Sequence, residues 1–206
     1  MTGLAPALLL GVVLGMRHAT DADHVVAVST IVTRRPGLSG ALRVGALWGA
    51  GHTLAVLLAG GAIILAGVAV PPNLALALEL CVAAMLIALG AWNLRSGARG
   101  DVDPSSARRP LLIGVVHGLA GSAAVALLVA AASPDPGWAL GYLLLFGLGT
   151  IGGMMGVTAA VAAPVALSRG RLEPFGRYLR MASGTLSIMV GLALAAQLTL
   201  LGGAPA

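Results

Sequence analysis

Apolar runs of about twenty residues recur along the whole of this 206-residue chain, and each is long enough to cross a bilayer as an α-helix. Hydrophobic residues make up 58% of the sequence and charged residues only 9%. A soluble domain carries about 25% charged residues, so we expect an all-α, polytopic membrane protein. Turn-forming stretches divide the single transmembrane domain, residues 1–206, into six spans: 4–31, 43–69, 73–94, 110–132, 138–167 and 178–201.

The basic charge of the chain is all arginine, and except for Arg17 it falls in three stretches, around residues 34–43, 95–109 and 169–180. Basic loops that alternate with pairs of spans are typical of the cytoplasmic side, which makes 95–109 a cytoplasmic linker and places both termini outside. The net charge of +5 therefore reflects topology and does not indicate a nucleic-acid partner. The abundance of Ala, Gly and Arg, with no Lys, suggests a GC-rich bacterial genome, and we expect the protein in the bacterial cytoplasmic (inner) membrane.

The two halves of the sequence resemble each other at offsets close to one hundred residues. LLLGVVLG at 8–15 matches LLIGVVHG at 111–118, and LWGAGHT in the second span resembles LFGLGT in the fifth. Repeats of three spans must insert in opposite senses, so the pattern predicts a 3+3 inverted-topology repeat with a substrate site near the midplane. The repeats cover residues 4–94 and 110–201.

The first span is interrupted by RHATDADH at residues 17–24, a stretch in which five of eight residues can carry charge. One Asp or Arg at the centre of a span costs about 2.5–3.5 kcal/mol, so Arg17, Asp21 and Asp23 together cost on the order of 8–10 kcal/mol before any pairing. A penalty of this size indicates a functional site. The alternative is a polar cluster whose members satisfy only one another.

On a continuous helix, His18, Asp21 and His24 fall on one face with Arg17, within about 120° of one another, whereas Asp23 projects from the other side. The shared face offers N and O donors without sulfur, which suit nickel, cobalt, zinc and manganese ions better than copper(I). Asp23 either ligates, if the helix is broken here, or binds a neighbouring helix. Arg17 is interpreted as the counter-ion of Asp21.

The other two histidines also lie inside predicted spans. His52, in WGAGHT, and His117, in VVHGLAGS, are roughly 10–14 Å from the inner face, and His18 reaches a similar depth from outside. All four histidines are therefore intramembrane, and at least three could share one layer. His52, followed by Thr53, is expected to bind the ion or to support a ligand. For His117 a core position is an equal alternative, and Glu79 either faces a vestibule or extends outward.

These motifs resemble those of the nickel/cobalt transporter family. RHATDADH matches its R-H-A-x-D-A-D-H signature, with the H-x4-D-H spacing on His18, Asp23 and His24, and GAGHT at 49–53 resembles its second motif, which places His52. The family belongs to the LysE-type transporter superfamily. With six spans, and HGLAGSAA and GTIGGMMG where the eight-span members carry acidic motifs, the chain is more similar to the short, urease-associated members.

The residues and the resemblance together predict a secondary transporter, not an enzyme, for a divalent transition metal, Ni²⁺ or Co²⁺. Inward transport is implied by the resemblance alone. The metal is a substrate rather than a cofactor, and any receiving cytoplasmic metallochaperone is a separate protein. The predicted ligands are polar residues of the first two spans: His18, Asp21, Asp23, His24 and His52. The residues predicted to support them or to line the pathway are Arg17, Thr53, Glu79 and His117.

Two alternatives to this function come from other classes of protein. One is an exporter of metal, or of a small anion or amino acid that Arg17 would contact. The other is a membrane-embedded metalloenzyme, which is less favoured because the sequence has no H-E-x-x-H motif.

Overall fold

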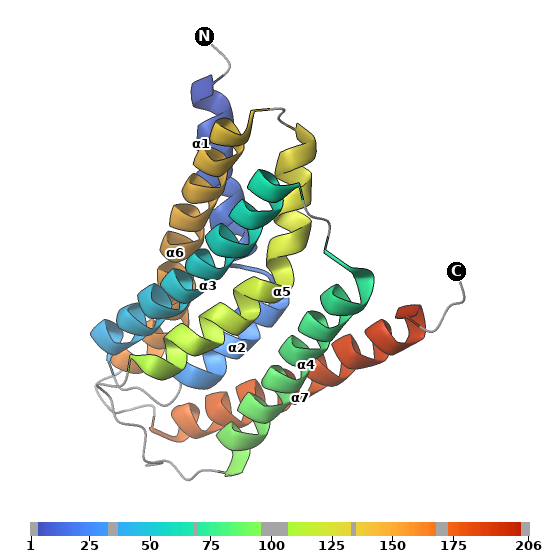
Figure 1. Cartoon of the computed structure of the whole chain (residues 1–206). Coiled ribbons are helices and arrows are strands. Elements are labelled where there is room, and N and C mark those ends of the chain that lie inside the picture. Colours follow the sequence, from blue (N-terminus) through green and yellow to red (C-terminus); the bar gives the residue numbers. More distant parts are fainter. Residues whose placement is uncertain are drawn as a thin grey trace.

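The computed structural model describes residues 4–32, 37–67, 70–95, 107–132, 135–167 and 173–202, and its secondary structure there is entirely α-helical. The prediction of an all-α chain is thus confirmed. Most of the predicted linker at 95–109 and both termini lie outside the described residues. The described helices (Figure 1) are α1 (Leu4–His18), α2 (Ala22–Val32), α3 (Leu38–Ala66), α4 (Pro72–Arg95), α5 (Arg108–Ala132), α6 (Pro136–Leu167) and α7 (Glu173–Gly202).

Four candidate membrane spans, long and apolar enough to cross a bilayer, are found within the described residues, in α3, α4, α6 and α7. They coincide closely with the second, third, fifth and sixth predicted spans, as expected of a multi-pass membrane protein. Helix α5 occupies the fourth predicted span. The first predicted span, in contrast, is not one helix: α1 and α2 are two shorter apolar helices that meet end to end.

The break between α1 and α2 follows directly after His18 and is made by local hydrogen bonds. The carbonyl of Arg17 accepts from the amide of Thr20 at 2.9 Å and from its hydroxyl at 2.6 Å. The amide of Asp21 donates to the carbonyl of His18 at 3.0 Å. Side chains such as Thr and Asp compete with the helical ladder in this way, and no Gly or Pro is needed. Helix α2 then begins with the bond from Val25 N–H to the Asp21 carbonyl, 3.0 Å long.

The turn between α3 and α4 uses the two residues that most strongly punctuate helices. Gly67 takes a left-handed φ of 63°, and its N–H donates to the carbonyl of Ile63, which ends α3 at Ala66. Helix α4 begins at Pro72, where the fixed φ of proline suits the first helical position and the missing N–H has no intrahelical acceptor. The chain is therefore able to reverse direction between two spans within a few residues.

The frame of the molecule is built from helix pairs that approach closely at glycine. Helix α3 packs along α5 and α6, α1 packs along α6, and α4 pairs with α7 (Figure 1). Gly15 of α1 lies against the backbone carbonyl of Phe146 on α6, and Gly118 of α5 against that of His52 on α3. Lipid tails supply no hydrophobic force between helices, so such close backbone contact is what holds them together.

Side chains divide between the interior and the outer surface as a membrane protein requires. Trp48, Leu86 and Met154 are fully buried in the core that α3, α4 and α6 share with α2. Large apolar side chains such as Leu58 and Leu200 point outward and are 67% and 78% exposed. In a bilayer these side chains face lipid, where their exposure carries no penalty.

The glycine contacts predict a clear difference between two neighbours on α6. A Cβ added at Gly153 would lie 2.6 Å from the Cβ of Ala19 and 2.9 Å from the carbonyl oxygen of Met16, whereas one added at Gly152 would meet nothing within 4 Å. We expect Gly153→Ala to lower the thermal unfolding midpoint of the purified protein, because overpacking costs about 1–3 kcal/mol. Gly152→Ala is the control and should leave the midpoint unchanged. Equal midpoints would show that α1 can move away from α6 without cost.

Candidate metal centre

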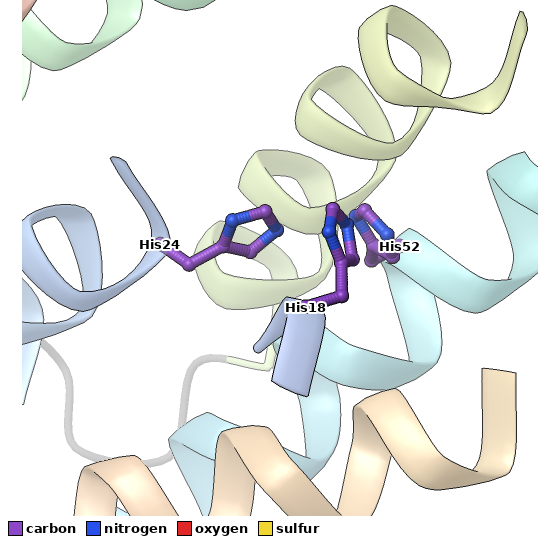
Figure 2. A group of neighbouring side chains, drawn as sticks. All are labelled: His18, His24 and His52. Carbon is purple, nitrogen blue, oxygen red and sulfur yellow. The ribbon is translucent and has the colours of Figure 1, made fainter. Parts of the chain in front are cut away.

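Four histidines from four helices meet in the interior of the protein. His18 ends α1, His24 is in the first turn of α2, His52 lies in the middle of α3, and His117 belongs to α5. The ring centroids of His18 and His24 are 4.5 Å apart, those of His18 and His52 are 5.2 Å apart, and those of His24 and His117 are 4.1 Å apart. Figure 2 shows the rings of the first three turned toward one another. The expectation that histidines distant in sequence share one level therefore holds for all four.

Two aromatic residues that the sequence analysis did not single out support the cluster. Trp48 stacks on His24, with ring centroids 6.1 Å apart and an interplanar angle of 14°, and Phe146 lies 5.4 Å from His18. The signal for Trp48 is its spacing, because it precedes His52 by one helical turn and so faces the same way. The ring of Trp48 is fully buried and so forms part of the apolar wall beside the cluster.

Several of the buried imidazole nitrogens lack a partner within the described part of the chain. Both ring nitrogens of His52, Nε2 of His24 and Nδ1 of His117 are buried and make no hydrogen bond. Buried polar atoms are almost always paired, so each exception requires an explanation. An imidazole nitrogen without a hydrogen-bond partner is available to bind a metal ion.

The two aspartates of the first motif take different positions. The carboxylate of Asp23 accepts from Nδ1 of His24 at 3.1 Å through one oxygen and from Nε2 of His117 at 3.0 Å through the other. The carboxylate of Asp21 accepts from Nδ1 of His18 at 2.9 Å, and its side chain is 55% exposed. Asp23 is therefore inside the cluster, whereas Asp21 lies at its edge and orients one ring.

The prediction drawn from a continuous helix is wrong for this segment. It placed Arg17 and Asp21 on the face of His18 and His24 and directed Asp23 away. Because the chain turns after His18, Asp23 joins the cluster, and Arg17 is exposed. Asp21 pairs with His18, and the described residues show no ion pair between Asp21 and Arg17. Of the two alternatives left open for Asp23, the structure shows the break in the helix that the first required and the contact to a neighbouring helix that formed the second, through His117 of α5.

The cluster faces a cavity of about 250 Å³. Of the two alternatives for Glu79, the structure matches the one in which it faces inward, from α4. Thr53 has a different role, since its hydroxyl donates to the carbonyl of Gly147 at 3.0 Å and joins α3 to α6. The cavity is lined by His18, Asp23, His24, His52, Glu79, Val82, His117, Ala120 and Leu194.

Two groups of three side chains in this cavity are close enough to hold a metal ion. His18, His24 and His52 form one group, and Asp23, His24 and His117 form the other, with candidate ligand atoms within 4.8 Å of one another in each. The donors are imidazole and carboxylate, which suit nickel, cobalt, zinc and manganese. The arrangement can therefore bind a borderline divalent cation in the interior of the helical frame.

No protein-family model and no solved structure matches the chain. Among characterised proteins, it is similar to the urease accessory protein UreH of Bacillus sp. (strain TB-90), with 32% identity over 207 residues. The match covers 92% of this chain and 90% of the relative. The similarity therefore extends through both halves of the sequence and well beyond the motifs at residues 17–53.

The positions of the two aspartates predict different effects on metal binding. Asp23→Asn weakens a carboxylate held between two histidines, so we expect it to lower Co²⁺ affinity by about 10–100-fold. Asp21→Asn removes only an exposed contact to His18 and should lower the affinity by less, at most a few-fold. Titration of the purified variants with Co²⁺, followed by visible absorption, measures both. A larger loss in Asp21→Asn would contradict the placement of the two side chains.

Proposed function

Because the chain belongs to the family of the urease accessory protein UreH, we propose that it is a secondary transporter of a divalent transition metal ion, Ni²⁺ first and Co²⁺ second. The observation that carries the proposal is the convergence of four histidines on one cavity inside a frame of apolar helices. The ion is the transported substrate, bound by His18, His24 and His52 with Asp23 beside them. The membrane is the bacterial cytoplasmic membrane, and transport is inward.

The charge of the cavity supports a cation as the substrate. Its acidic lining residues within the described chain are Asp23 and Glu79, and with neutral imidazoles their two negative charges match one divalent ion. An anion would be repelled by both carboxylates. Arg17, which an anion exporter would use, is exposed and does not line the cavity. The anion and amino-acid alternatives therefore lose the residue on which they depended.

The choice of metal rests on the donors and on the relative. Sites of nitrogen and oxygen donors bind nickel and cobalt more tightly than manganese or iron(II), and imidazole suits both ions. The relative is a urease accessory protein, and the sequence motifs resemble those of nickel/cobalt transporters; both favour nickel. A separate metallochaperone would receive the ion in the cytoplasm.

The broken first segment is what an intramembrane binding site requires. Backbone that leaves the helical ladder within a membrane is tolerated where it lines a cavity or is buried in protein. Transporters commonly place their substrates at such discontinuous helices. Here the last residue of α1, His18, and the first turn of α2, with Asp23 and His24, meet at the cavity.

The packing of the helices supports a mechanism of alternating access between two inverted repeats. Gly11 and Gly15 of α1 lie against Tyr142 and Phe146 of α6, so these helices run parallel, and α5 runs parallel to α3 in the same way. Helices α3 and α6 run antiparallel to each other. In the two repeats α1 corresponds to α5, and α3 corresponds to α6. If each helix is replaced by its counterpart, the α1–α6 contact becomes the α5–α3 contact. A 3+3 inverted repeat has this property, and rocking of one repeat against the other would expose the site to each side in turn.

The test is uptake of radioactive nickel by cells that express the intact chain or the double variant His18→Ala/His24→Ala at equal membrane levels. We expect accumulation with the intact chain and background uptake with the double variant, because two of three ligands are lost. Thr199→Ala is the matched control, since the side-chain hydrogen bonds that this exposed residue makes within the described part of the chain stay inside its own helix. Its uptake should equal that of the intact chain.

The outcomes separate import from the alternatives. Lower accumulation with the intact chain, abolished in the double variant, would replace import by metal export through the same site. Unchanged nickel handling in every strain would contradict a nickel transporter. Nickel entry into proteoliposomes containing only the purified chain then distinguishes transport by the protein itself from an indirect effect in cells.

A further inference from the structure

The two groups of candidate ligands share one residue, His24, and draw their other members from different parts of the fold. His18 and His52 belong to α1 and α3, which lie in the first half of the chain with α2. The second group joins Asp23 and His24 of α2 to His117 of α5, in the other half. One group is therefore local to the first half, and the other connects the two halves.

The separations in the second group are those of ligands around a single ion. Nδ1 of His24 and Nε2 of His117 lie 3.1 and 3.0 Å from the two oxygens of Asp23. Neighbouring ligand atoms at bond lengths near 2.1 Å are about 3.0–3.4 Å apart in octahedral or tetrahedral sites. An ion could replace the two hydrogen bonds with little movement of the side chains once each ring carries its proton on its other nitrogen, Nε2 of His24 and Nδ1 of His117.

The ring of His24 has one nitrogen available for each group. Nδ1 faces Asp23, whereas Nε2 is buried and has no partner within the described residues. The ring lies between His18 and His117, with centroid distances of 4.5 and 4.1 Å. A neutral imidazole has a single acceptor nitrogen, so His24 binds one ion at a time.

We propose that the cavity contains two overlapping ion positions, His18–His24–His52 and Asp23–His24–His117, and that one divalent ion passes between them by exchange at His24. This inference rests on the proposed transport function and specifies its path. Both positions need the single acceptor nitrogen of the neutral His24 ring, so they are occupied one at a time. In the first position the ion is bound only by ligands from the first half of the chain. In the second position it joins α2 to α5, so the position of the ion is coupled to the arrangement of the two halves.

The experiment titrates the purified full-length protein with Co²⁺ and records stoichiometry, affinity and visible spectrum. Parallel nickel flux into proteoliposomes is measured for the same samples. The variants are His52→Ala, which disables the first position, His117→Asn, which disables the second, their combination, and His24→Ala. Asn at residue 117 can still donate a hydrogen bond to Asp23 but is a poor ligand, so it retains the contact between α2 and α5. Thr199→Ala is again the control.

We expect one Co²⁺ per chain in the intact protein. His52→Ala and His117→Asn should each still bind one ion, with two different spectra, and neither should support flux. Because the affinities of two alternative positions add, the variant that keeps the stronger position should lose at most about twofold in affinity and the other variant should lose more. The combination and His24→Ala should not bind. Unfolding midpoints equal to that of the intact chain confirm that the variants are folded. If the His117→Asn protein does not fold, His117→Ala provides a second test of the same position.

Other results would overturn the inference without affecting the proposed function. Normal flux in a folded His117→Asn or His117→Ala protein would show that the second position is not used. Binding of two Co²⁺ per chain would contradict exchange at a shared ligand. Complete loss of binding in a folded His52→Ala protein would show that the cavity has a single site instead of two overlapping positions. If the intact protein bound ions as expected but carried no nickel, the proposed function would fail while the two positions remained.

Discussion

The carboxylate of Asp23 connects two helices whose backbones do not approach each other within the described residues. It accepts hydrogen bonds from His24 on its own helix, α2, and from His117 on α5. Helix α2 otherwise contacts α3, α4, α6 and α7, so this small group of side chains bridges the space between α2 and α5. The cavity occupies that space. The carboxylate thus links α2 to α5 through an interaction that a metal ion would replace.

The surrounding frame is held by a different kind of contact. Pairs such as Gly49 with Ile151 and Gly114 with Trp48 bring backbones together so closely that an added methyl group would collide. These pairs fix α3, α5 and α6, and therefore His52 and His117. Helix α2 has no glycine and is held through side chains such as Val28 and Ile31. His52 and His117 thus lie on the tightly packed frame, whereas Asp23 and His24 lie on a helix held without close glycine contacts of its own.

The sequence predicted the helices well because the length of an apolar run and the rise of a helix determine where a span begins and ends. The same arithmetic predicted that histidines far apart in sequence reach one depth. It failed at residues 17–24, where a helical period of 3.6 residues continues through the motif and no Gly or Pro marks the break. The turn depends on the hydroxyl of Thr20 and the amide of Asp21, and such local bonds compete with a helix only when the surrounding fold favours them. The partner of Asp23 is 94 residues away, and no local pattern could identify it.

The site lowers the stability of the protein that contains it. His52 is only 1% exposed, and neither of its ring nitrogens has a partner among the residues that the structure describes; an unsatisfied buried polar group costs about 1–3 kcal/mol. A leucine or isoleucine at residue 52 would fill the same space without that cost, and paired histidines would also be cheaper. The structure instead directs imidazoles toward a cavity bordered by Asp23 and Glu79, where a divalent cation would satisfy both the nitrogens and the carboxylates. Binding of an ion would recover the cost and its departure would restore it, which is the condition that the proposed transport site must meet to release its substrate.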